Sequence, residues 1–200
     1  MHEIGSHEGQ PYLVMDYTAG PTLAPLCAGR PVTPRRAATY FKKIAEALHD
    51  AHEHGVLHRD LEPSNVLVDS DDEPHVTDFG LAKRFSDQPD SALQVSELTV
   101  SGQVLGSPGY MAPEQAGGRK NHIGREADVY ALGAILFHRL TGRPPLIAET
   151  ITDTARMVLE NDPIVPGSLV LGIPKDLETV CLKCLQMDPR RRYASALHLA

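Results

Sequence analysis

The residues with the clearest chemical potential lie in one stretch, residues 58–65, of sequence HRDLEPSN. The Asp60 carboxylate can accept a hydroxyl proton and orient the hydroxyl oxygen for attack. Asn65 follows five residues later and offers an amide oxygen, a ligand that hard divalent cations prefer. The stretch therefore favours a site that activates a hydroxyl group beside a metal ion. Because an ordinary loop can also contain these residue types, the interpretation depends on partner motifs elsewhere in the chain.

Two partner motifs follow in order, D-F-G at residues 78–80 and A-P-E at residues 112–114. Together with the H-R-D-L-x-x-x-N spacing of residues 58–65, they resemble the catalytic core of protein kinases. The chain resembles a bacterial Ser/Thr protein kinase of the eukaryotic-like (Hanks) type, over nearly all of its 200 residues. The resemblance implies ATP-dependent phosphoryl transfer to Ser or Thr hydroxyls of a protein substrate.

The resemblance also implies an α+β, protein kinase-like fold, with a mostly helical C-lobe and a remnant of the N-lobe sheet. Residues 1–200 are then one partial kinase domain. Residues 1–18 correspond to the last N-lobe strands and the hinge. Residues 19–200 correspond to the C-lobe, and the chain stops inside what resembles the last helix.

Hydrophobic periodicity and turn residues predict the elements that position these motifs. Thr33 reads as the N-cap of a long helix with Pro34 in its first turn, and Gly55 suits its end. The predicted elements are a strand, turn and strand over 1–17, a short helix over 22–27, strands at 66–68 and 75–77, and helices at 128–140, 149–160 and 175–187.

The kinase resemblance assigns catalytic roles to three residues. Asp60 would orient the substrate hydroxyl toward the γ-phosphate of ATP. Asn65 and Asp78 would bind Mg²⁺, with the ion at Asp78 bridging the β- and γ-phosphates. The implied cofactors are therefore ATP and Mg²⁺, and the implied partners are ATP and a protein with Ser or Thr acceptors.

Four residues match positions that contact the adenine in the family. Met15 matches the gatekeeper, and Asp16 and Thr18 lie in the hinge, where backbone groups hold the base. Leu67 matches the residue that packs under adenine. An edge hairpin and an ordinary core leucine are the alternatives for these two segments.

A second group of residues matches structural positions of the family. His58 and Phe79 match two members of an internal hydrophobic spine. Asp128 matches the residue that hydrogen-bonds the backbone of the catalytic loop, the name used below for residues 58–65. Arg192 matches the arginine that pairs with the Glu114 carboxylate.

Residues 81–111 form a long polar stretch without strong periodicity, which corresponds to the activation segment. Phe79 and Gly80 would form the pivot of the activation segment. A phosphate on Thr99 or Ser101 would pair with Arg59 and order the segment. An unmodified loop is an equally good interpretation of either hydroxyl.

Residues 106–111 resemble the peptide-docking loop, with Ser107 where threonine is usual. This hydroxyl and the Pro63-Ser64 pair indicate Ser/Thr rather than Tyr substrates.

The overall composition is that of an ordinary globular protein, with 42% hydrophobic and 22% charged residues. The net charge of −7 argues against binding nucleic acid or an anionic membrane surface. The longest apolar run, residues 130–137, is too short for a membrane span. The first residues lack the basic and apolar regions of a signal peptide, so the sequence predicts a cytoplasmic location.

Two groups of potential metal ligands have simpler interpretations. Three cysteines do not make a disulfide framework, and Cys181 and Cys184 lie in an apolar helical pattern that favours core packing over a metal or redox site. The histidines at 49, 52, 54 and 58 spread around a helix and its exit loop, so a metal site there is the less favoured interpretation.

Position 62 departs from the family pattern, because Glu62 stands where related Ser/Thr kinases carry a lysine between Asp60 and the γ-phosphate. At about 5 Å and an effective dielectric constant near 20, each unit charge is worth roughly 3 kcal/mol. We therefore expect charge reversal to slow phosphoryl transfer on the order of a thousandfold or more. A Glu62 side chain that turned to solvent or paired with a basic residue would not have this effect.

Two hypotheses follow from these patterns. The first is an active Ser/Thr kinase, favoured by Asp60, Asn65 and Asp78. The second is a non-catalytic binding module, either a pseudokinase or a truncated kinase fragment. It is favoured by Glu62 and by the absence from these 200 residues of a G-x-G-x-x-G loop, a V-A-I-K strand lysine and the αC glutamate.

Overall fold

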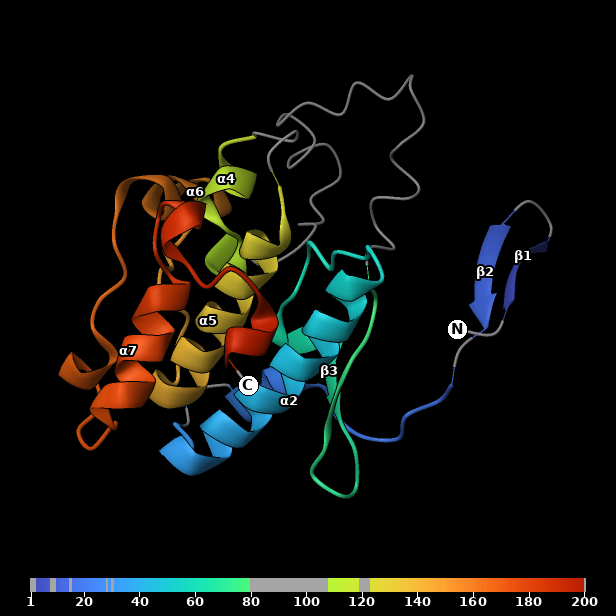
Figure 1. The fold of residues 1–200 in the computed structure, drawn as a ribbon, viewed down its shortest axis with the longest axis horizontal. Coiled ribbons are helices and arrows are strands. Elements are labelled where there is room, and N and C mark those ends of the chain that lie inside the picture. The colour runs from blue at the N-terminus through green and yellow to red at the C-terminus, as the bar shows by residue number, and fades with distance from the viewer. Residues whose placement is uncertain are drawn as a thin grey trace.

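The computed structural model describes residues 3–7, 10–14, 16–27, 29, 31–79, 108–118 and 123–199 of the chain. Their elements run β1, β2, α1, α2, β3, β4 and then α4 to α7, with short 3-10 turns between them. In Figure 1 the helices pack into one body around α5, and an extended segment joins the β1–β2 hairpin to that body. The architecture is therefore the predicted α+β, dominated by helices.

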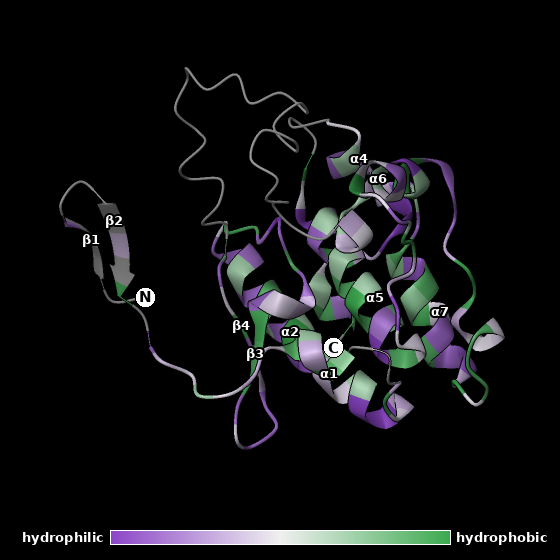
Figure 2. Ribbon diagram, turned by 180° about the vertical axis from the view of Figure 1, so that it is seen from behind, coloured by the Kyte–Doolittle hydropathy of each residue, from purple (hydrophilic) through white to green (hydrophobic). Residues whose placement is uncertain are grey.

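Helix α5 (Arg125–Thr141) is the centre of the described fold. Residues 127–140 are all buried, so this part of the helix has no solvent-facing stripe. Helices α2 (Pro34–Glu53) and α7 (Lys175–Cys184) pack against it. Figure 2 shows hydrophobic residues along α5, whereas α2 alternates hydrophobic and hydrophilic positions. Among the described helices, none combines the length and apolarity that crossing a bilayer requires.

Helix α2 begins and ends where the sequence predicted. The Thr33 side chain accepts a hydrogen bond from the Arg36 backbone N–H at 3.4 Å, and proline follows in the first turn. Gly55, with a φ of +75°, lies just after the last turn, in the left-handed region that glycine adopts at little cost. The end of α2 thus delivers the chain directly to the catalytic loop.

The strands form two small antiparallel pairs. Strand β1 (Glu3–His7) pairs with β2 (Gln10–Val14), which are the two strands predicted within residues 1–17. Strand β3 (Val66–Val68) pairs with β4 (Pro74–Val76). The fourth strand was predicted over 75–77 and lies one residue earlier, because Thr77 bonds the end of the catalytic loop instead.

The remaining elements differ in length from the sequence pattern. Helix α7 ends at Cys184 rather than 187, and a 3-10 turn (Ala196–Leu199) stands where the last helix was expected to begin. Helix α4 (Pro113–Ala116), within the A-P-E region, was not predicted. The other helices are α1 (Leu23–Cys27) and α6 (Ile151–Glu160).

The two cysteines of the C-x-x-C sequence are core residues. Cys181 and Cys184 are fully buried, and the Cys181 thiol donates to the Gly133 carbonyl oxygen on α5 at 3.6 Å. A Cβ atom at Gly133 would collide with Cys184, so the close approach of α5 and α7 requires glycine there. The burial confirms the predicted core packing of this pair.

A buried ion pair joins α4 to the segment after α7. The Arg192 guanidinium donates to both Glu114 carboxylate oxygens, at 2.7 and 2.8 Å, and to the Glu126 carbonyl oxygen at 2.8 Å. It also lies over the Tyr130 ring, 4.9 Å from the centroid. The predicted Arg192–Glu114 contact is therefore present, and its two parallel bonds fix the orientation of α4.

Tyr110 ties the turn at Pro108–Tyr110 to α5. Its hydroxyl lies 2.5 Å from Nδ1 of His138, and the two rings stack. Burial lowers the pKa of His138, the Arg139 charge lowers it further, and backbone hydrogen bonds oppose the shift. Burial also raises the pKa of Tyr110. The protonated hydroxyl therefore donates to a neutral imidazole.

The Tyr130 hydroxyl gives a first test of this packing. Tyr130 is buried, and its hydroxyl has no hydrogen-bond partner among the described residues. We expect Tyr130→Phe to leave the free energy of unfolding unchanged or to raise it by up to about 1 kcal/mol, whereas Tyr110→Phe should lower it by about 1 kcal/mol. Urea unfolding measures both. A Tyr130→Phe variant less stable than Tyr110→Phe would contradict this account.

His138 gives a pH test. Because folding lowers its pKa, the folded state favours the neutral ring. That stabilisation is complete above the ordinary histidine pKa of 6.5 and is lost as the pH falls toward the folded-state pKa. We expect the urea midpoint to fall between about pH 7 and about pH 5, and to fall less in His138→Gln, whose amide oxygen can still accept from Tyr110. Equal falls in both proteins would show that His138 is not responsible.

Candidate active site

The Asp128 carboxylate on α5 anchors the catalytic loop by accepting hydrogen bonds from its backbone. Asp128 accepts the His58 backbone N–H at 2.9 Å and the Arg59 backbone N–H at 2.7 Å. It also contacts Nε2 of His52, on α2, at 2.8 Å. Asp128 is 1% exposed, so these bonds form away from water. The backbone contact that the sequence predicted for Asp128 is present.

Arg59 has an unusual backbone conformation, with a φ of +67°. A residue with a Cβ rarely adopts this region, and it persists where the surroundings fix it. Here Asp128 holds the Arg59 N–H, and the Gln115 side chain donates to the Arg59 carbonyl oxygen at 2.7 Å. Sequence reasoning missed Gln115, whose only signal is its place directly after A-P-E.

The loop is joined to the D-F-G motif through His58. The His58 ring is buried, its Nε2 lies 2.9 Å from the Thr77 carbonyl oxygen, and it packs on Phe79 with centroids 4.9 Å apart. His58 and Phe79, which the sequence matched to an internal hydrophobic spine, are therefore in contact. His52 is engaged with Asp128 and His58 with the Thr77 backbone, and no group of three or more His, Cys, Asp or Glu side chains in the described ranges is arranged to hold a metal ion.

Asn65 connects the two ends of the site. Its side-chain N–H donates to the Asp60 backbone carbonyl oxygen at 2.8 Å. The backbone carbonyl oxygen of Asn65 accepts the Thr77 backbone N–H at 2.9 Å. Asp78 follows with a φ of +60° and an exposed side chain, to which the Thr77 hydroxyl donates at 3.3 Å. These bonds bring Asp60, Asn65 and Asp78 into one site.

The donor atoms of this site suit a hard cation such as Mg²⁺. The bond to Asp60 occupies the Asn65 amide nitrogen, so the amide oxygen is the atom left for a metal ion. The Asp78 side chain is exposed, and Thr77, the residue before it, is hydrogen-bonded to the Asn65 backbone. Oxygen ligands of this kind fit the implied ion.

The environment of Asp60 makes it a stronger base than a free carboxylate. Burial raises the pKa of the Asp60 carboxyl, the negative charges of Glu62 and Asp78 add to the rise, and His58 opposes it. A carboxylate with a raised pKa accepts a proton more readily at neutral pH. The arrangement therefore suits acceptance of a hydroxyl proton.

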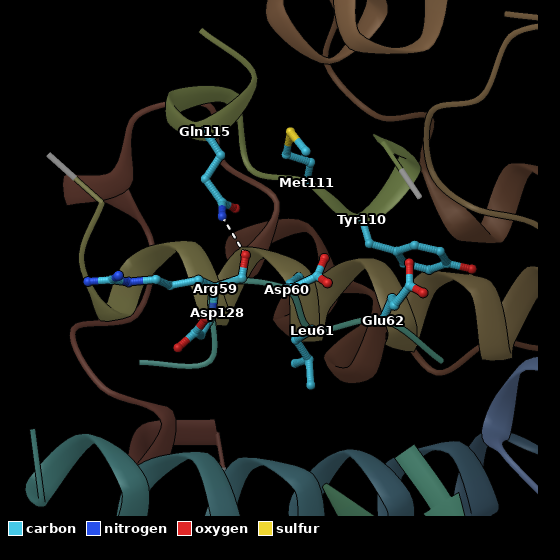
Figure 3. Close-up of a pocket in the computed structure, with 9 residues that line it drawn as sticks. Arg59, Asp60, Leu61, Glu62, Tyr110, Met111, Gln115 and Asp128 are labelled. Carbon is cyan, nitrogen blue, oxygen red and sulfur yellow. Dashed lines mark hydrogen bonds between the residues drawn. The ribbon is translucent and has the colours of Figure 1, made fainter. Parts of the chain in front are cut away.

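Glu62 lies in the same pocket as Asp60. Figure 3 shows both carboxylates on the side of the loop that faces Tyr110 and Met111, while the Arg59 side chain points away. The pocket is lined by Arg59, Asp60, Leu61, Glu62, Tyr110, Met111, Gln115, Asp128 and Ala131. Glu62 is half-buried and accepts a hydrogen bond from the Ser64 hydroxyl. It therefore does not turn fully to solvent.

Two segments carry the residues that the sequence assigned to adenine binding. Leu67 is half-buried in β3, between its β4 partner and a bridge to Thr22. Asp16 is exposed and Thr18 half-buried in the extended segment after β2. The predictions for Met15, Gly80, Thr99, Ser101 and Ser107 fall outside the described residues.

Comparison with known proteins agrees with this geometry. The family model "Protein kinase domain" matches residues 1–199. The chain is 34% identical over 190 residues to serine/threonine-protein kinase PknB of Mycobacterium tuberculosis, covering 94% of the chain and 29% of the relative. It is also 34% identical over 197 residues to serine/threonine-protein kinase PrkC of Bacillus subtilis, covering 98% of the chain and 29% of the relative.

The chain thus spans less than a third of the length of these curated relatives. The matched region nevertheless contains the catalytic loop, the D-F-G motif and the A-P-E motif, whose contacts are described above. The resemblance to bacterial Hanks-type kinases inferred from the sequence is confirmed, and the chain belongs to the protein kinase domain family.

Proposed function

We propose that this chain provides the catalytic and substrate-docking part of a protein serine/threonine kinase, which transfers the γ-phosphoryl group of ATP to a Ser or Thr hydroxyl. The observation that carries the proposal is the fixed loop around Asp60. Asp128 and Gln115 hold the residue before it, and Asn65 holds its carbonyl oxygen. Such a loop positions a base while leaving its carboxylate in the pocket.

Asp60 is the residue that touches the acceptor. Its carboxylate hydrogen-bonds the substrate hydroxyl and takes the proton as the oxygen–phosphorus bond forms and the bond to the leaving ADP breaks. The raised pKa of Asp60 favours this proton transfer. The loop bonds keep the carboxylate oriented, so little reorganisation is needed during the reaction.

Asn65 and Asp78 hold the metal in this proposal. Bound Mg²⁺ supplies positive charge that neutralises the phosphate oxygens. Asp16, Thr18, Met15 and Leu67 form the adenine side of the site. Because the phosphoryl donor is ATP, we also propose that the domain works in the cytoplasm.

The acceptor side of the site favours a protein substrate. Tyr110 and Met111, together with Ser107, belong to the peptide-docking loop, and the Ser64 hydroxyl donates to Glu62, which lines the pocket. Regulation would act through Arg59, whose exposed side chain is suited to pair with a phosphate on Thr99 or Ser101.

The second candidate is a non-catalytic binding module, and Glu62 is the observation that favours it. Its carboxylate faces the pocket beside Asp60, where related kinases have a cation. A negative charge there opposes the binding of the γ-phosphate and the charge that develops on it.

Replacing Glu62 separates the two candidates. We expect Glu62→Lys to raise the turnover number at least tenfold in the full-length natural protein, with a smaller change in the Michaelis constant for ATP, because the cation acts mainly on the transition state. Asp60→Asn in the same background should remove most of the transfer. Radiolabelled phosphate transfer to a generic basic protein measures all three.

Glu160→Lys is the matched control, because it makes the same charge change at an exposed position at the end of α6. It should leave the rate near that of the natural protein. Equal, Asp60-dependent rates in the natural protein and Glu62→Lys would refute the inhibitory effect of Glu62. Absence of transfer by every variant would favour the binding module.

A further inference from the structure

The Gln115 side chain links the A-P-E turn to the catalytic loop. Its side chain leaves α4 and crosses to the catalytic loop, where Nε2 donates to the Arg59 carbonyl oxygen at 2.7 Å (Figure 3). Its Oε1 accepts the Ala112 backbone N–H at 3.1 Å. Both polar ends of the amide are therefore used, one by the A-P-E turn and one by the loop.

The Arg59 carbonyl is an informative place for such a bond. The carbonyl oxygen of Arg59 and the N–H of Asp60 belong to one rigid peptide plane. A bond that fixes this oxygen therefore fixes the direction from which the chain enters Asp60. The following peptide plane is fixed in the same way, because Asn65 donates to the Asp60 carbonyl oxygen at 2.8 Å.

The left-handed conformation of Arg59 makes this bond necessary. At a φ of +67°, Arg59 keeps its conformation only through bonds from outside the loop. Asp128 supplies the bond on the N–H side at 2.7 Å, and Gln115 supplies the bond on the carbonyl side. Without Gln115, the Arg59–Asp60 peptide plane can rotate while Asp128 still holds the preceding N–H.

We propose that Gln115 is a positioning residue for the transfer reaction, which couples the A-P-E turn to Asp60 through the Arg59–Asp60 peptide plane. This inference rests on the proposed kinase function. Gln115 acts on the catalytic carboxylate through the backbone and does not touch the reacting atoms. Its effect is therefore on the turnover number rather than on nucleotide binding.

Two substitutions separate the two bonds of Gln115. Gln115→Glu keeps an acceptor for the Ala112 N–H but replaces the donor with an oxygen that repels the Arg59 carbonyl. Gln115→Leu loses both bonds. Gln186→Leu is the matched control, because Gln186 also donates from its side chain to a backbone carbonyl, that of Leu182, at 3.4 Å and outside the site.

We expect both Gln115 variants of the full-length natural protein to lose about tenfold in turnover number, because small displacements of a catalytic group are costly. The dissociation constant for Mg-ATP, measured with a fluorescent ATP analogue, should change less than twofold. Gln186→Leu should match the natural protein in both measurements. If Gln115→Glu retained full activity and Gln115→Leu did not, only the Ala112 bond would matter and the inference would be wrong.

Hydrogen exchange tests the same inference without catalysis. We expect the amides of residues 57–61 to exchange several-fold faster in Gln115→Glu and at the natural rate in Gln186→Leu, since the Arg59 turn opens more often when one of its two bonds is lost. Unchanged exchange in Gln115→Glu would overturn the inference whatever the activity. A natural protein without Asp60-dependent transfer would instead refute the proposed function, and the exchange rates would still decide the role of Gln115.

Discussion

The interaction on which the rest of the structure depends is the set of three bonds to the Asp128 carboxylate. A buried carboxylate is costly unless its oxygens are satisfied, and here two backbone N–H groups and the His52 ring satisfy them. The donors come from the loop and from α2, whereas the acceptor belongs to α5. The carboxylate thus makes the position of the loop a property of the helix packing, and any shift of α2 against α5 would move Asp60.

Asp128 anchors the catalytic loop from its α5 side, which leaves the pocket side of the loop to the reactive groups. Leu61 points into the core while Asp60 and Glu62 stay on the pocket side, so one turn of chain is both packed and available. The raised pKa of Asp60 shows that the arrangement has a cost, because burial and two neighbouring carboxylates disfavour its ionised form. The bonds from Asp128, Gln115 and Asn65 hold the loop against that repulsion.

Features carried by local spacing could be predicted from the sequence. The Thr33 cap, the Gly55 terminator and the packing of Cys181 follow from residues a few positions apart in the chain. The Asp128 and Arg192 contacts followed from family resemblance, because they join residues about 70 or more apart in the chain. Gln115 and the Tyr110–His138 bond could not be predicted, since no periodicity records which distant backbone group a polar side chain reaches.

The cysteines give the chain a property unrelated to the proposed phosphoryl transfer. All three, Cys27, Cys181 and Cys184, are buried, and burial raises the pKa of each thiol. A thiol that is both inaccessible and protonated reacts slowly with alkylating reagents. Cys27 lies in α1, which packs against β3, whereas the other two lie between α5 and α7. Alkylation followed by mass spectrometry would therefore read out, site by site, which half of the core opens first when the folded chain is stressed.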